Sequence, residues 1–231
     1  MKKVVIVTGA GRGLGKALAI GLSRKGFIVV ATARSKNKLK ELESRLKNDY
    51  MLEKCDITIW EDCEKLVKKV IDKYGQIDVL INNAGGAYVK TSLLDSTKDQ
   101  IDSVFDTQVK GTVYITKAVL TQMVKQKSGK IYTITHIAYR LGEAFYGSPL
   151  KTLHLASLFG KAAVADLVAV EAKNYGIQSI PVFIRWVASE LDIDDKMEPG
   201  KKANHPNEVT QAIIADLSSN KEVKEIFIKP P

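Results

Sequence analysis

The sequence has little cysteine and no long apolar run, and each shortage excludes a class of protein. The two cysteines, Cys55 and Cys63, lie eight residues apart. This spacing fits no metal or redox motif, so reduced thiols in a cytoplasmic protein are expected. No apolar run approaches the roughly 20 residues that span a bilayer, and glycines interrupt the N-terminal run too early for a signal peptide. We expect neither a membrane segment nor export.

Arginine is also scarce, although the chain is basic. Lysine and arginine total 35 against 26 acidic residues, which gives a net charge of +9, and only six of the 35 are arginines. The lysines are spread along predicted helices, as is typical of a solvated surface, and no cluster resembles a nucleic-acid-binding arm. We expect no nucleic-acid partner. A net positive charge also suits the binding of a phosphorylated small ligand. The question is then whether any arginine lies where such a ligand would bind.

Short apolar runs alternate with amphipathic segments along the whole chain. Strands are predicted at 3–8, 27–33, 51–55, 78–82, 130–135, 177–184 and 223–228, and helices at 14–26, 36–47, 59–74, 97–125, 151–175 and 206–218. Right-handed crossovers then predict an α/β fold with a doubly wound parallel sheet of about seven strands and helices on both faces. We expect one Rossmann-type domain over 1–231. The irregular stretch 185–207 follows the sixth strand and is a candidate substrate loop.

A glycine-rich turn joins the first strand to the first helix. The segment Thr8–Gly15 reads TGAGRGLG. Glycines allow the backbone to turn tightly beside a pyrophosphate, and the following helix offers free N–H groups and the positive end of its dipole. Because this turn follows a buried strand and opens a helix, it predicts a dinucleotide-binding site.

The end of the second strand indicates which dinucleotide binds. An acidic residue there would hold the ribose 2′-hydroxyl of NAD(H), but the chain has Ala33, Arg34 and Ser35. Arginine grips a phosphate with two hydrogen bonds, and Arg12 in the glycine turn can reach the same place. We therefore predict NADP(H) in preference to NAD(H), with a solvated Arg34 as the alternative.

These motifs resemble those of the short-chain dehydrogenase/reductase family over essentially the whole chain. Besides the glycine turn, the matches are the CDIT segment with Asp56 and the INNAG segment ending at Gly85. The resemblance implies an oxidoreductase acting on a small carbonyl or alcohol substrate. It also implies a homodimer or homotetramer formed through helices 97–125 and 151–175. The candidate cofactor-binding residues are Thr8, Gly9, Gly11, Arg12, Gly13, Leu14, Gly15, Arg34, Ser35, Asp56, Ile57, Asn82, Ala84 and Gly85.

The catalytic positions depart from the family pattern. The family uses an asparagine for a water relay, a serine that fixes the carbonyl, a tyrosine that donates a proton, and a lysine one helical turn later. By the resemblance, these positions hold Gln108, His136, His154 and Leu158 in this chain. The candidate catalytic residues are therefore His154, His136 and Gln108.

Two interpretations of these changes remain open. Histidine exchanges protons near neutrality, so His154 can replace the tyrosine as proton donor while His136 polarises the carbonyl. Tyr146 in the preceding loop is a second candidate donor. Alternatively, the chain is a non-catalytic NADP(H)-binding regulatory or interaction protein, and Leu158 favours that interpretation. A metal site is not expected, because two histidines without a third ligand do not form one.

Overall fold

A computed structural model describes residues 2–85, 91–141, 152–184, 187, 204–219 and 221–228. Two predicted features therefore lie outside the described residues. These are the candidate donor Tyr146 and most of the candidate substrate loop 185–207.

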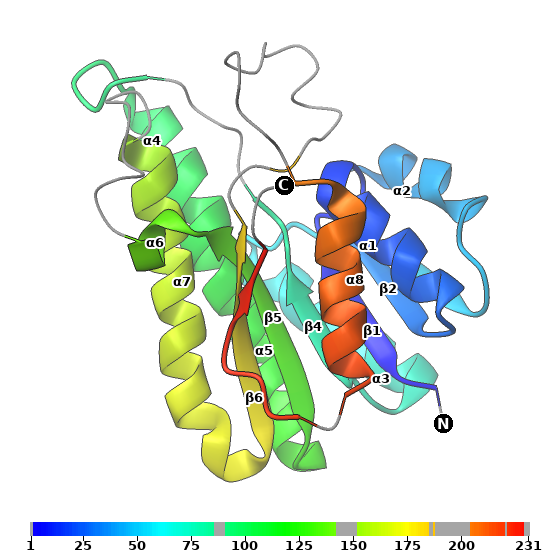
Figure 1. Ribbon diagram of the computed structural model, residues 1–231. Coiled ribbons are helices and arrows are strands. Elements are labelled where there is room, and N and C mark those ends of the chain that lie inside the picture. Colours follow the sequence, from blue (N-terminus) through cyan, green and yellow to red (C-terminus); the bar gives the residue numbers. More distant parts are fainter. Residues whose placement is uncertain are drawn as a thin grey trace.

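Seven parallel strands form a single sheet in the order β3-β2-β1-β4-β5-β6-β7 (Figure 1). This doubly wound order confirms the predicted fold class. The reversal of strand order lies between β1 and β4, and ligands of such sheets bind at the carboxyl ends of these strands. The strands are β1 (Val4–Thr8), β2 (Ile28–Ala33), β3 (Tyr50–Lys54), β4 (Val79–Asn82), β5 (Gly129–His136), β6 (Ile177–Ile184) and β7 (Ile226–Phe227).

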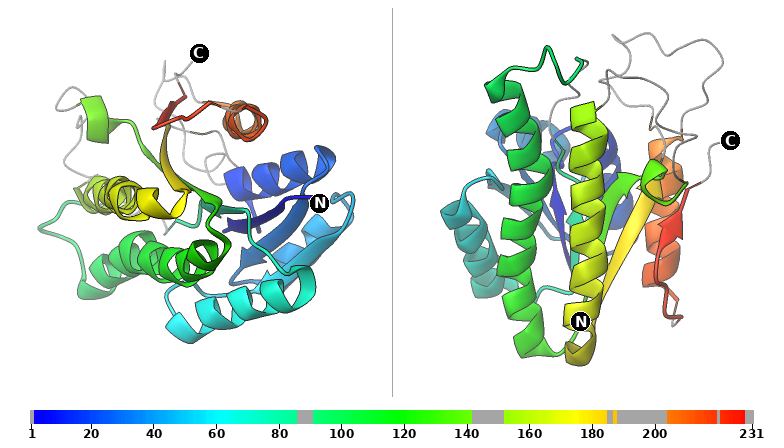
Figure 2. Two further views of the ribbon diagram at one scale, coloured as in Figure 1. Left: turned by 90° about the horizontal axis from the view of Figure 1, so that it is seen from below. Right: turned by 90° about the vertical axis from the view of Figure 1, so that its left-hand side faces the viewer.

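Helices cover both faces of the sheet (Figure 2). Helices α1, α2 and α8 pack on one face, and α3, α5 and α7 pack on the other. The α-helices are α1 (Gly13–Arg24), α2 (Lys36–Glu43), α3 (Trp60–Tyr74), α4 (Lys98–Phe105), α5 (Gly111–Gln126), α6 (Ala138–Leu141), α7 (Thr152–Ala172) and α8 (Pro206–Leu217). A π-helix η1 (Asp106–Lys110) joins α4 to α5, and a 3₁₀ turn η4 (Lys173–Tyr175) ends α7.

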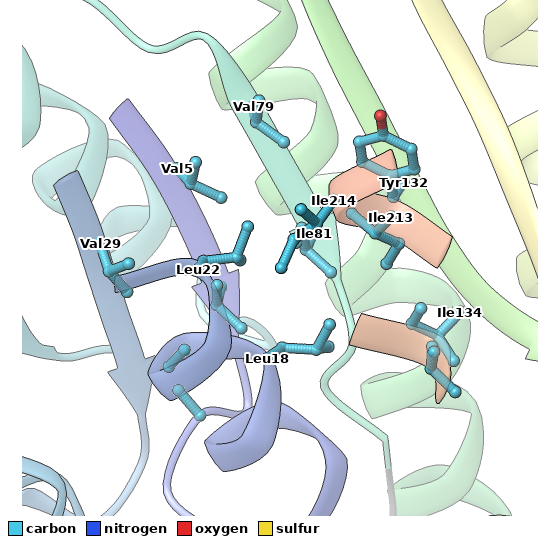
Figure 3. Packing of buried hydrophobic residues seen from close by; sticks show 14 of the residues in the cluster. Val5, Leu18, Leu22, Val29, Val79, Ile81, Tyr132, Ile134, Ile213 and Ile214 are labelled. Atoms are coloured by element: carbon cyan, nitrogen blue, oxygen red, sulfur yellow. The ribbon is translucent and has the colours of Figure 1, made fainter. Parts of the chain in front are cut away.

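The core beneath α1 and α8 fixes the glycine turn on the sheet. Leu18 and Leu22 of α1 point toward Val5 and Ile81 of the central strands, and Ile213 of α8 closes the same cluster (Figure 3). All five side chains are fully buried. Burial of a leucine or isoleucine side chain contributes roughly 1.5–3 kcal/mol, so this cluster holds the start of α1 rigidly beside β1 and β4.

Three predicted elements differ from the structure. The helix predicted at 36–47 ends at Glu43, because the next backbone bonds, from Arg45 to Leu42 and from Leu46 to Glu43, span three residues instead of four. The helix predicted at 97–125 is interrupted by η1. The last strand shrinks from 223–228 to Ile226–Phe227, and the short α6 was not predicted.

The segment Thr152–Tyr175 is long and apolar enough, by length and composition alone, to cross a membrane. The sequence argument that no such run exists is therefore too strong. A core helix passes the same test, and α7 packs against β5 and β6 while leaving one apolar side uncovered.

Candidate functional site

The glycine turn places backbone where side chains cannot fit. Gly9 has φ +68°, and a Cβ there would lie 2.8 Å from the Cα of Ala84. A Cβ on Gly15 would overlap the carbonyl oxygen of Gly9. The first turn of α1 therefore packs directly onto the turn after β1. This is the close approach that a pyrophosphate cradle requires.

Thr8 ties this cradle to the turn after β4. Its buried hydroxyl donates to the Ile81 carbonyl at 3.1 Å and accepts the amides of Asn83 and Ala84, both at 3.0 Å. The Asn83 side chain returns a bond of 2.9 Å to the Thr8 carbonyl. Two predicted cofactor segments, Thr8–Gly15 and Asn82–Gly85, are thus one connected unit.

We expect Thr8→Val to weaken this unit. The change removes one donated bond and leaves two amides without their acceptor, which costs roughly 1–3 kcal/mol for each unsatisfied buried group. Urea unfolding should show a loss of about 2 kcal/mol or more. Thr121→Val is the matched control, since that exposed hydroxyl bonds only its own helix at Lys117. Equal stability of the two variants would show that the Thr8 bonds do not hold the cradle.

The N-terminus of α1 is open to an anion. Arg12 is its N-cap residue, makes no side-chain cap bond, and is followed by no acidic residue in the first turn. The free N–H groups and the helix dipole then favour negative charge at this point.

Three basic residues, Arg12, Arg34 and Lys38, lie in segments that meet near the end of β2. Arg12 and Arg34 are exposed, and Ser35 caps α2 by accepting the amide of Lys38. A Cβ on Gly11 would lie 3.1 Å from the Cβ of Lys38, so this lysine borders the glycine turn. Sequence reasoning missed Lys38, because only the packing of α2 brings it there.

The cofactor-binding candidates Asp56 and Asn82 have definite hydrogen-bond partners. One Asp56 oxygen accepts the amide of Thr58 at 3.0 Å and its hydroxyl at 2.8 Å, which shapes the turn that also carries buried Ile57. Asn82 is buried, and its amide nitrogen donates to Thr116 at 2.8 Å. The Asn82 side chain therefore joins β4 to α5.

The predicted catalytic residues lie at the same edge of the sheet as the cradle. His136 ends β5, and its Nδ1 accepts the amide of Ala138 at 3.1 Å. His154 lies in the first turn of α7, and the neighbouring Thr135 hydroxyl donates to the Leu158 carbonyl at 2.8 Å. That bond holds the end of β5 against the start of α7.

Gln108 lies on the π-helix η1 and is buried. Its amide nitrogen approaches Gly85, where a Cβ would lie 3.2 Å away. Single π-turns occur frequently at functional sites, because the extra residue redirects a side chain. Here η1 directs Gln108 toward the turn after β4.

Comparison with known proteins identifies the family. The profile described as short chain dehydrogenase matches residues 3–195. The chain belongs to the short-chain dehydrogenase family. An uncharacterised oxidoreductase of Staphylococcus epidermidis is 26% identical and covers 99% of this chain and 97% of its own. A relative of the same description from Staphylococcus saprophyticus is 29% identical with the same coverage.

Solved structures of short-chain dehydrogenases share the whole fold. ElxO with NADP bound superposes with a TM-score of 0.86 at 25% identity, over 99% of this chain and 97% of that chain. A metagenomic short-chain oxidoreductase in complex with NADP gives 0.83 at 23% identity, over 99% and 97%. The chain thus shares the fold of these short-chain dehydrogenase structures over almost its whole length.

Sequence reasoning missed a further residue of this short-chain dehydrogenase site. Lys161 of α7 is buried, and its Nζ donates to the Ala84 carbonyl at 2.8 Å and lies 3.5 Å from Gln108 Oε1. Burial alone lowers its pKa from 10.5 to about 7. The sequence offered one signal for Lys161, because a lysine is unexpected among the apolar residues around it in the segment that forms α7.

Proposed function

We propose that this chain is an NADP(H)-dependent oxidoreductase that interconverts a small carbonyl compound and its alcohol, with His154 as the proton donor. The observation that carries the proposal is the open N-terminus of α1, with exposed Arg12 and Arg34 beside it and no acidic residue in its first turn. Two neighbours in structure, ElxO and the metagenomic oxidoreductase, are described as NADP complexes, which supports the same cofactor here.

The residues present fit NADP(H). The glycine turn and the α1 amides would hold the pyrophosphate, Arg12 and Arg34 would hold the 2′-phosphate, and the Asp56–Ile57 turn would border the adenine. Ala84 and Gly85 follow β4, which lies between β1 and the strand that carries His136, so they would face the nicotinamide half. NADPH, when bound, supplies the hydride.

His136 and His154 then act on the substrate oxygen. Because Nδ1 of His136 accepts a backbone amide, the neutral ring carries its proton on Nε2, which makes that atom a hydrogen-bond donor. Nε2 of His136 would polarise the carbonyl, and His154 would supply the proton that its oxygen takes up on reduction. In the oxidation direction His154 takes the proton back.

Leu158 favours a second candidate function. By the family resemblance, a lysine that holds the nicotinamide ribose belongs at this position, and leucine offers no hydrogen bond. A non-catalytic protein that binds NADP(H) and responds to its occupancy requires only the cradle and the cations.

Two assays together separate the candidates. Calorimetry with NADPH and NADH measures binding, and NADPH oxidation across a panel of aldehydes, ketones and quinones measures turnover. The oxidoreductase predicts binding and turnover, the regulatory protein predicts binding alone, and absence of NADPH binding would contradict both.

We also propose a cytoplasmic homodimer or homotetramer. Helices α5 and α7 lie side by side (Figure 2), and α7 exposes Leu167 and Val170, which are 69% and 76% exposed. These two residues lie three apart and so share one face of the helix. Covering such a face with a second copy removes apolar surface from water.

We expect Leu167→Glu with Val170→Glu to reduce the oligomer to a monomer, because two carboxylates would be buried in the interface. Size-exclusion chromatography with light scattering measures the mass. The control is Leu94→Glu, since Leu94 is 94% exposed and lies outside both helices. An unchanged mass in the double variant would place the interface elsewhere.

A further inference from the structure

Lys161 is the one described lysine that is nearly fully buried, with 1% of its surface exposed. It lies on the same stripe of α7 as His154 and Leu158, at intervals of seven and three residues. Helix side chains lean toward the N-terminus, so a long lysine chain at 161 reaches back toward the turn that carries Leu158 and His154. Its position in the helix therefore aims the amine at the proposed site.

The amine joins two parts of that site. Its bond to the Ala84 carbonyl holds the turn after β4, and its contact with Gln108 Oε1 holds the side chain presented by η1. Gln108 in turn approaches Gly85 with its amide nitrogen. Lys161, Gln108 and the Ala84–Gly85 turn form a closed cluster drawn from three separate segments of the chain.

We propose that Lys161 is a positioning residue that holds the Ala84–Gly85 turn and Gln108 in the arrangement that receives the nicotinamide half of NADP(H). The inference rests on the proposed cofactor. Removing the amine leaves the partly buried Ala84 carbonyl and the buried Gln108 amide oxygen without this donor, so the turn loses its fixed shape.

The proposed role of Lys161 can be tested through a change in the protonation of its amine when the cofactor binds. A neutral amine has two N–H groups, and the described residues offer it two acceptors, Ala84 O and Gln108 Oε1. A charged ammonium carries a third N–H and needs compensation in a buried site. The phosphates of NADP(H) are negative, so binding favours the charged form and takes up a proton.

Several charged groups on α7 and on the elements packed against it pair with one another, and the remaining ones, Asp99, Lys117, Lys125, Glu171 and Lys173, are exposed. These pairs are Lys98–Asp102, Asp106–Lys110, Lys130–Asp216, Arg140–Asp166 and Arg140–Glu225, together with the Tyr132–Asp216 hydrogen bond. The titratable groups of the proposed catalytic site are His136 and His154. Because Lys161→Met keeps both histidines and binds the same cofactor, a pH effect that is lost in this variant reports on Lys161.

The test is calorimetric titration of NADPH at pH 7.5 and 9, in buffers of different ionisation enthalpy. We expect the wild type to take up part of a proton and to bind about fivefold or more weakly at pH 9, below the limit of tenfold per pH unit for one proton. Lys161→Met should bind more weakly at pH 7.5, with no proton uptake and less than about a twofold change with pH.

Urea unfolding in the absence of cofactor supplies the second readout. The folded-state pKa of about 7 lies below the ordinary value of 10.5, so the unfolded chain holds more protons between these values. Wild-type stability relative to Lys161→Met should therefore rise with pH across that window, by up to about tenfold in the folding constant per unit.

Each failure has a distinct meaning. If wild-type protein binds NADPH with no proton uptake, or if Lys161→Met keeps the same uptake and affinity, the Lys161 proposal is overturned while the proposed function stands. If wild-type protein does not bind NADPH, both fall. Should Lys161→Met not fold, the wild-type proton uptake alone decides.

Discussion

His154→Ala should lose carbonyl reduction by about 100- to 10,000-fold in kcat, the range that a positioned general acid contributes. Its affinity for NADPH should stay within about twofold, since the cradle at Thr8–Gly15 is built from other segments. The expected loss is large because no tyrosine–lysine pair occupies the family positions on α7, where His154 and Leu158 lie instead. Steady-state kinetics with the best substrate of the carbonyl panel measures the effect.

His205→Ala is the matched control for this change. His205 caps α8 by accepting the amide of Asn207, so its loss affects a helix end and leaves the proposed proton donor in place. We expect a stability loss of about 1 kcal/mol and little change in kcat. Turnover by His154→Ala equal to wild type would remove His154 from the mechanism and direct attention to Tyr146.

The second large effect concerns the choice of cofactor. We expect Arg12→Ala with Arg34→Ala to weaken NADPH binding by about 100-fold or more, because each charge-assisted contact to a phosphate is worth roughly 1.5–3 kcal/mol. NADH affinity should change by less than about threefold, since NADH has no 2′-phosphate. Calorimetric titration of both dinucleotides measures the two constants on one protein.

Arg24→Ala is the control, because Arg24 is exposed at the opposite end of α1. It changes the net charge in the same sense without touching the proposed phosphate site. A similar loss of NADPH affinity in Arg24→Ala would show that overall charge, rather than Arg12 and Arg34, attracts the cofactor. Lys38→Ala should show a smaller, NADPH-specific loss.

The sequence predicted the sheet and the tight turn after β1 well because both have strong local signals. Apolar runs such as Val4–Val7 favour buried strands, and glycines at 9, 11, 13 and 15 between such a run and an amphipathic segment favour a tight strand-to-helix turn. Six of the seven strands lie within one residue of the predicted bounds, and β7 begins three residues later than predicted.

What remained unpredictable depends on contacts between distant segments. Nothing in the sequence analysis distinguished Lys161 from the other lysines. Only the packing of α7 against η1 and the turn after β4 brings it into the candidate site. The π-turn that carries Gln108 leaves no periodic signal, since one extra residue hardly alters the apolar pattern. Lys38 likewise enters the phosphate region only through the placement of α2.

The most direct test of the proposed function is hydride transfer itself. NADPH carrying deuterium at the nicotinamide C4 position is incubated with the protein and the carbonyl panel, and the products are examined by mass spectrometry. The oxidoreductase proposal predicts an alcohol that carries one deuterium with wild-type protein and almost none with His154→Ala. Tight NADPH binding without deuterium in any product would contradict it and favour a cofactor-responsive binding protein.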